Sequence, residues 1–371
     1  MNPKNESIDY LRGLAIVAII VIHILAWHDN SILTEYTKMP LLFNLRNLLQ
    51  FSVVTLVVCS GFSLYLTHKE LSLKPNELLA FYKKRIKHLL IPWWIFLAIF
   101  FIIHTIIKYT FKIELVDLSK KNIISSFLMA GGIGFGWLIL LMLMLTFLFP
   151  FLKYLFENVD KKVLFSIMTV AYIGSILLFN KNYFNILNYG IYDIKFIPLI
   201  TFVIPFIIGW SIIYTVGFSL NHFYNEHPSI KKELHLTFGF IVSFIAIDFI
   251  YYFKGFERVL YLSKYPPSPY YLSYGLMATY ILLTIFFSYR HVIHIYFKRF
   301  LSFFSSNSYW LFMWNGLTLS LIIPFLKVFN FSNIYVKLIF DIILNFIFVY
   351  VLVFLQKKLI KIEMHLTSHH F

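Results

Sequence analysis

Residues 8–27 read IDYLRGLAIVAIIVIHILAW, with no Asp, Glu, Lys or Arg after Arg12. A helix needs about 20 mostly apolar residues to cross a hydrocarbon layer about 30 Å thick. This stretch has that length, and the chain contains further apolar runs like it. We expect them at residues 41–67, 91–107, 134–151, 163–179, 196–217, 235–253, 270–289, 307–329 and 334–355. Backbone polar groups in lipid must be paired within the chain, and the runs lack the alternation of a membrane barrel, so we predict a bundle of about ten transmembrane helices.

The composition supports this fold class. Of the 371 residues, 60% are hydrophobic and 13% are charged, whereas an ordinary soluble domain is roughly half apolar and about a quarter charged. No stretch of soluble-domain length separates the apolar runs. We therefore expect one all-α integral membrane domain over residues 1–371.

The formal net charge of +15 comes from basic residues scattered among the loops, which form no continuous stripe. This pattern argues against a nucleic-acid partner. If the N-terminus lies inside, the inner loops and the C-terminal tail carry more Lys and Arg than the outer loops. The positive-inside rule then places both termini in the cytoplasm, and lipids surround the bundle.

The first run also holds the best candidates for chemistry. Arg12 and His23 are eleven residues apart, about three helical turns, so they share one helix face roughly 16 Å apart. Asp9 lies one turn before Arg12. Ionisable groups in a membrane cost at least about 2.5 kcal/mol each, so they face a partner or a polar cavity. We expect this face to line a shared, water-accessible tunnel.

Two interpretations of this face remain open. In the first, Arg12 extends to the inner headgroups with Asp9 as its ion-pair partner, and His23 makes one buried hydrogen bond. In the second, Arg12 holds a phosphate or carboxylate, and His23 takes a proton from a hydroxyl group.

Further along the chain, three features allow a structural or a functional interpretation. The basic segment that includes Lys84 and Arg85 either anchors the chain to anionic lipid or attracts a ligand's phosphates, with Arg85 as the preferred contact. Ser60 either packs at a helix crossing or lines a cavity. Trp137 is either an interface anchor or a stacking surface for substrate.

Other segments give simpler predictions. A helix should start at Pro92. The prolines of residues 264–269 exclude regular helix there, so this segment should form a loop, a cavity wall or a re-entrant turn. Asp248 and Asp341 lie within apolar runs and need partners, or else they line a polar route. The sequence has one cysteine and no metal-ligand cluster, so we expect no metal site.

The segment from Ile8 to Ala15, together with His23, resembles the motif of arginine, ten residues and histidine that opens the integral membrane acyltransferase 3 family. Other segments resemble that family in the same order along the chain. They are Ser60-Gly61-Phe62, residues 81–92, Gly136-Trp137-Leu138 and residues 306–314.

The resemblance implies a membrane-bound acyltransferase that moves an acyl group from a cytoplasmic acyl-CoA, often acetyl-CoA, to a hydroxyl of a cell-surface glycan. It implies His23 as the catalytic residue and Arg12 as a donor-binding residue. Arg85 and Lys84 would assist Arg12. Asp9, Ser60, Trp137 and Asn315 would line the substrate cavity.

Many members of the family carry a histidine where this chain has Asn315, and an amide cannot cycle a proton near neutral pH. His23 is therefore the main candidate, either as general base or as acyl carrier.

We expect the plasma membrane of a bacterial cell as the location. The rival functions are a non-enzymatic exporter of polysaccharide or lipid-linked precursor and a membrane scaffold. The acceptor glycan and the oligomeric state, a homo-oligomer included, stay open.

Overall fold

The computed structural model describes residues 3–27, 40–129, 131–188, 196–225, 230–326 and 333–368. Across these residues every regular element is a helix, and the one isolated bridge joins Lys264 to Pro267. This confirms the all-α prediction. The elements are α1 (Pro3–Trp27), α3 (Pro40–Leu48), α4 (Phe51–Thr67), α5 (Pro75–Phe111), α6 (Lys120–Phe127), α7 (Gly136–Asn158), α8 (Lys161–Asn188), α9 (Phe196–Asn225), α10 (Ile230–Phe253), α11 (Pro269–Ser288), α12 (Arg290–Tyr296), α13 (Lys298–Ser306), α14 (Ser308–Leu326) and α15 (Ile334–Ser368).

Within the described ranges, nine helical spans are long and apolar enough to cross a membrane. Helix α14, with 19 residues, coincides with the ninth predicted run but is not one of these nine spans. The predicted runs therefore correspond to helices of the bundle, and the chain is a multi-pass membrane protein.

The second run corresponds to the single candidate span Pro40–Thr67, which a short break between Leu48 and Phe51 divides into α3 and α4. One predicted boundary needs correction. The third helix does not start at Pro92, which lies inside the 37-residue helix α5. Helix α5 starts at Pro75, and its first turns are amphipathic: Phe81 is buried while Lys83 is exposed. An amphipathic segment stays helical beyond the apolar run because its charged face remains in contact with water.

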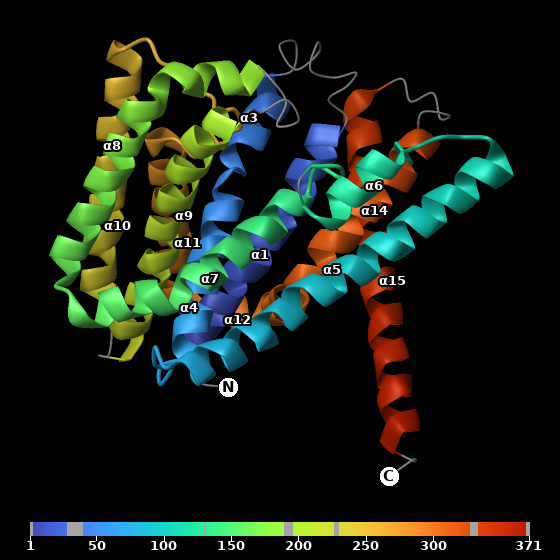
Figure 1. Cartoon of the computed structure of the whole chain (residues 1–371), viewed down its shortest axis with the longest axis horizontal. Helices are drawn as coiled ribbons and strands as arrows, with labels where there is room; N and C mark the ends of the chain where they lie inside the picture. The colour runs from blue at the N-terminus through green and yellow to red at the C-terminus, as the bar shows by residue number, and fades with distance from the viewer. Residues whose placement is uncertain are drawn as a thin grey trace.

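Helices α1 and α4 form the centre of the bundle (Figure 1). Helix α1 packs against α4, α11, α13 and α14, and α4 packs against α9 and α11. The span of α1 is 67% buried within the protein, whereas that of α10 is only 6% buried. Side chains on α1 therefore face other helices, and those on α10 mostly face outward.

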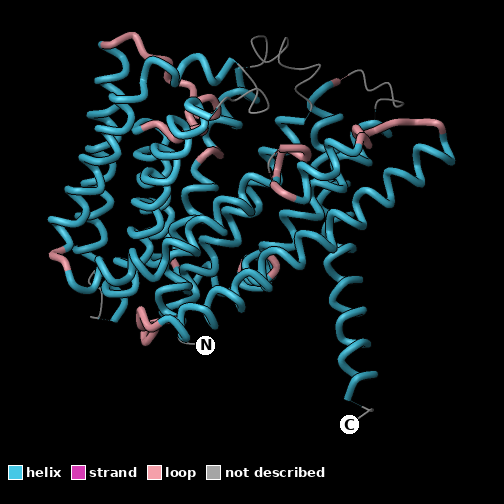
Figure 2. The backbone as a smooth tube through the Cα atoms, viewed as in Figure 1, coloured by secondary structure: helices cyan, strands magenta, loops and turns pink. Residues whose placement is uncertain are grey.

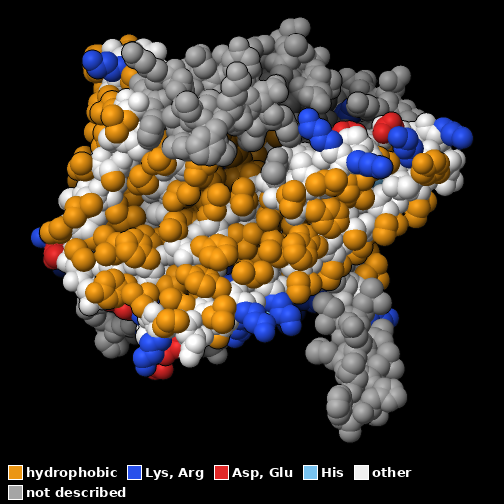
Figure 3. Space-filling view, in the orientation of Figure 1, with side chains coloured by type: hydrophobic (Ala, Val, Ile, Leu, Met, Phe, Trp, Pro, Cys, Tyr) orange, Lys and Arg blue, Asp and Glu red, His pale blue; other side chains and the backbone are white. Residues whose placement is uncertain are grey.

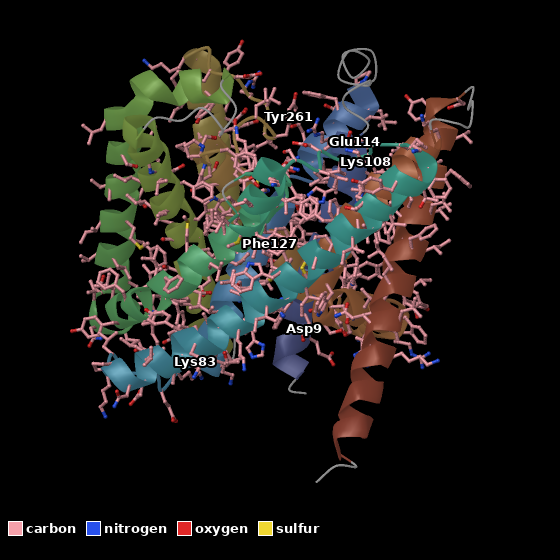
Figure 4. The ribbon with its side chains drawn as sticks, turned by 45° about the vertical axis from the view of Figure 1, so that its right-hand side comes forward. Asp9, Lys83, Lys108, Glu114, Phe127 and Tyr261 are labelled. Atoms are coloured by element: carbon pink, nitrogen blue, oxygen red, sulfur yellow. The ribbon has the colours of Figure 1, made fainter. Side chains whose placement is uncertain are left out.

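Helix α1 begins and helix α15 ends towards the lower side of the bundle, and α5 crosses its front diagonally (Figures 1 and 2). A broad hydrophobic band covers the visible face, with Lys and Arg side chains above and below it (Figure 3). Asp9 and Lys83 lie towards the lower end, and Lys108, Glu114 and Tyr261 towards the upper end (Figure 4). The placement of both termini in the cytoplasm remains a prediction from loop charge.

Helices α4 and α9 touch backbone to backbone. A Cβ atom at Gly61 would lie 2.1 Å from the carbonyl oxygen of Tyr214, and one at Gly217 would lie 2.3 Å from that of Val58. Only glycine allows so close an approach, as at small-residue crossings of membrane helices. The contact fixes the position of α4, whose Ser60 and Ser63 line the first cavity described below.

Candidate active site along helix α1

A cavity of about 350 Å³ lies beside the N-terminal half of α1, and we call it the Arg12 cavity. Its walls come from α1, α4, α5, α7 and α14. The lining residues are Arg12, Ile16, Leu56, Ser60, Ser63, Leu64, Thr67, Arg85, His88, Leu89, Leu138, Ile139, Met142, Thr146, Ser308, Tyr309 and Phe312.

Arg12 is held by three neighbours. Its guanidinium donates to the carbonyl oxygen of Cys59 at 3.2 Å and to the hydroxyl of Ser63. It also pairs with Asp9 at 3.8 Å, and Ser305 donates to Asp9 at 3.3 Å. The predicted Asp9 ion pair is therefore present, but Arg12 faces a cavity inside the bundle. These contacts hold the guanidinium in place and leave it accessible to a ligand.

Arg85 lies in the same cavity wall, as the sequence interpretation preferred. It donates to His68 Nδ1 at 3.4 Å. Burial, and then the charge of Arg85, lower the pKa of His68, so that the imidazole can accept as a neutral group. Lys84 is exposed and does not line the cavity, and its donor-binding role remains a prediction.

The lining of the Arg12 cavity is basic. It contains Arg12, Arg85 and His88, and its residues in the described ranges include no Asp or Glu. Arginine forks bind phosphate oxygens in pairs, so this wall suits a phosphorylated ligand. Ser60 adds a hydroxyl to it, which supports the cavity-lining interpretation of that residue.

A second cavity, of about 220 Å³, lies at the other end of α1, and we call it the His23 cavity. Helices α1, α3, α7 and α14 and the segment between α10 and α11 form its walls. The lining residues are Ile22, His23, Ala26, Arg46, Gln50, Gly134, Phe135, Trp137, Tyr261, Lys264, Tyr265, Gly316 and Leu319.

The walls of the His23 cavity are rich in aromatic and cationic groups. Trp137 meets Tyr265 edge to face with 4.7 Å between the ring centres. The Lys264 ammonium lies 5.1 Å from the centre of the Trp137 ring, and the Arg46 guanidinium lies 4.1 Å from that of Tyr261. The proline-rich segment therefore forms a cavity wall, one of its predicted forms, and Trp137 lies where a substrate could stack.

Asn315 is fully buried and contacts His23 directly, with 2.8 Å between the amide Nδ2 and the imidazole Nδ1. In this orientation the amide donates, and its Oδ1 has no hydrogen-bond partner among the described residues. Turning the amide by half a turn exchanges its oxygen and nitrogen. Asn315 Oδ1 then accepts a hydrogen bond from His23 Nδ1–H, and the Nε2 of His23 keeps its lone pair. In either orientation, the amide of Asn315 fixes which nitrogen of His23 carries the proton.

Phe312 lies between the two cavities. Its side chain lines the Arg12 cavity, and its ring centre lies 5.7 Å from that of His23. On the far side, Phe135 of the His23 cavity meets Phe312 edge to face at 6.3 Å. Arg12 and His23 therefore face two cavities with an aromatic partition between them, and not the single shared tunnel that we expected.

Several site residues escaped the sequence analysis. Ser63 binds Arg12, and Arg46, Lys264 and Tyr261 surround the histidine's cavity. For Lys264 the signal was the irregular proline-rich segment. Ser63 had a weaker signal, its position one helical turn after Ser60.

Of the two acidic residues in apolar runs, Asp248 pairs with Arg258 at 3.4 Å. This confirms the structural interpretation of Asp248. Asp341 is fully buried in α15.

The model of the acyltransferase domain that defines the acyltransferase 3 family matches residues 5–355 of this chain. The match covers nearly the whole chain. The chain therefore belongs to the acyltransferase 3 family, and it is a multi-pass membrane acyltransferase. Neither the curated proteins nor the solved structures contain a match to it.

Proposed function

We propose that this acyltransferase moves an acyl group, normally acetyl, from a cytoplasmic acyl-CoA to a hydroxyl of a cell-surface glycan in a bacterial plasma membrane. One observation carries the proposal. A single helix presents Arg12 to a basic cavity and His23 to an aromatic cavity at its other end, with Phe312 between them. The donor and the acceptor would enter from opposite faces of the membrane.

The Arg12 cavity is the donor site in this proposal. Arg12 and Arg85 bind the phosphates of the coenzyme, and Ser60 lines the path of its acyl arm. The thioester then points towards Phe312, whose side chain must swing aside for the acyl carbon to reach His23. The positive-inside rule favours the cytoplasmic side for this cavity, and acyl-CoA is a cytoplasmic donor in this proposal.

The His23 cavity is the acceptor site. With Asn315 Oδ1 accepting from Nδ1–H, the Nε2 lone pair of His23 removes the proton of an acceptor hydroxyl. The hydroxyl oxygen attacks the thioester carbonyl, the new C–O bond forms, and the C–S bond breaks. The coenzyme thiolate leaves and takes the proton from the imidazolium. In the alternative route, Nε2 itself attacks the thioester carbonyl, the C–S bond breaks and the coenzyme thiolate leaves. The acceptor hydroxyl then attacks the acyl-imidazole, the N–C bond breaks, and the hydroxyl proton passes to the thiolate through Nε2.

The aromatic wall supports a sugar as the acceptor. Trp137, Tyr261 and Tyr265 all line the cavity. Aromatic side chains combine a broad apolar face with, in Tyr and Trp, a polar tip. Such a wall suits a ligand with an apolar ring face and hydroxyl groups at its rim.

The proposal is tested with purified protein in lipid nanodiscs, radiolabelled acetyl-CoA and envelope glycan of the host cell. His23→Ala should abolish acetyl transfer and leave membrane insertion intact. His235→Ala is the matched control, because His235 is exposed on α10 and its Nδ1 contacts the Lys231 carbonyl oxygen one helical turn away. Full activity of His23→Ala would refute the catalytic role of His23. Movement of glycan without consumption of acetyl-CoA would support the exporter instead.

A further inference from the structure

Lys264 is a cation that the proposed reaction does not yet use. It lies between α10 and α11, close along the chain to Tyr261, which Figure 4 places at the upper end of the bundle. Its ammonium group borders the His23 cavity, 5.1 Å from the ring centre of Trp137 and 5.2 Å from that of Tyr265. In the described part of the chain, no carboxylate lies within ion-pair distance of it.

The surroundings of Lys264 disfavour its charge. Burial, and then the positive charge of Arg46, lower the pKa of Lys264 to about 8. The two aromatic rings partly compensate for the lost hydration of the ammonium group through cation–π contacts. A bound anion would stabilise the positive charge of Lys264 further.

The position of the Lys264 ammonium group in the His23 cavity indicates which ligand it would bind. Lys264 borders the same small cavity as His23, and Arg46 adds a second cation to the wall. A ligand that places a hydroxyl at His23 therefore brings its neighbouring groups within reach of both cations. Charge-assisted hydrogen bonds in such a site are about twice as strong as neutral ones.

We propose that the acceptor binds as an anion: Lys264, with Arg46 beside it, binds a carboxylate or phosphate group of the glycan while His23 faces the hydroxyl to be acylated. The inference rests on the proposed function and specifies its acceptor class as an acidic glycan. A uronic acid residue and a sugar phosphate offer the same oxygen chemistry to Lys264.

The experiment uses the full-length protein in nanodiscs with radiolabelled acetyl-CoA. Envelope glycan from the host is separated by anion exchange into neutral and acidic fractions, and transfer to each fraction is measured. Part of the acidic fraction is treated with carbodiimide and borohydride to reduce carboxylates, and another part with hydrofluoric acid to remove phosphates. The treatment that removes acceptor activity identifies the anionic group.

Two variants test whether Lys264 causes the preference for the acidic fraction. Lys264→Met should raise KM for the acidic fraction at least about tenfold, as expected for a lost charge-assisted hydrogen bond, with KM for acetyl-CoA unchanged. Lys264→Arg should retain most of the preference. Lys254→Met is the control, because Lys254 is exposed in the same interhelical segment and does not line the cavity.

Label in the acidic fraction, with the KM effect confined to Lys264→Met, supports the proposal. Label mainly in the neutral fraction would overturn it and leave the acyltransferase function standing. A fall in kcat without a rise in KM in Lys264→Met would also overturn it, because Lys264 would then act on the reacting carbonyl oxygen. Absence of label from both fractions would refute the proposed glycan acceptor, and this inference with it.

Discussion

The contact between Asn315 and His23 gives the sharpest test of the proposed mechanism. Asn315→Leu keeps a side chain of similar size and removes both polar ends of the amide. The lost hydrogen bond is 2.8 Å long and fully buried on the Asn315 side. Such a bond contributes about 0.5–1.5 kcal/mol net, and the imidazole also loses the group that selects its tautomer. We expect kcat to fall about 10- to 100-fold, equivalent to about 1.4–2.7 kcal/mol of transition-state stabilisation.

The assay is steady-state acetyl transfer in nanodiscs, with insertion checked by size-exclusion chromatography. KM for acetyl-CoA should not change, because Asn315 does not line the Arg12 cavity. Asn315→Asp is the companion variant, since it keeps an acceptor oxygen at the same place and removes the amide N–H. We expect it to stay within about tenfold of wild type. An unchanged kcat in Asn315→Leu would refute the positioning role, and equal losses in both variants would show that the amide donates to Nδ1.

Two further predictions concern the donor site and the helix crossing. Arg85→Gln should raise KM for acetyl-CoA about tenfold or more, as expected for a lost bond to a charged group. Lys84→Gln should change this KM less than about twofold, because an exposed lysine contributes little. Equal effects of the two variants would contradict the assignment of Arg85 to the cavity. Gly61→Ala should lower the free energy of unfolding by about 1–3 kcal/mol, typical of overpacking, because the new Cβ would lie 2.1 Å from the Tyr214 carbonyl oxygen. Thermal denaturation followed by size-exclusion chromatography measures this loss. An unchanged midpoint would show that α4 and α9 separate easily.

The bundle was predictable because membrane helices are specified by apolar length, a property of local sequence. The differences lie where local sequence does not decide. The break between α3 and α4 comes after Leu48 within one apolar run, so hydropathy gives no signal for it. The start of α5 was missed because the first turns of α5 are amphipathic, and Pro92 is accommodated inside the helix.

The site was predictable only as far as one helix extends. Helical spacing placed Arg12 and His23 on the face of α1 that borders the cavities. The partners of His23 come from distant segments: Asn315 is 292 positions away along the chain, and Lys264 lies between α10 and α11. Tertiary packing brings these residues together, and no local spacing encodes it.

The aromatic partition at Phe312 has an electrical consequence. Water that enters the two cavities from opposite faces would thin the insulating layer of the membrane to the few side chains around Phe312. The membrane voltage would then fall mainly across that layer, since the field concentrates where the dielectric is lowest. The acyl group is uncharged and passes through this layer without electrical work, whereas the proton that moves from the acceptor hydroxyl to the coenzyme thiolate would cross most of the voltage there.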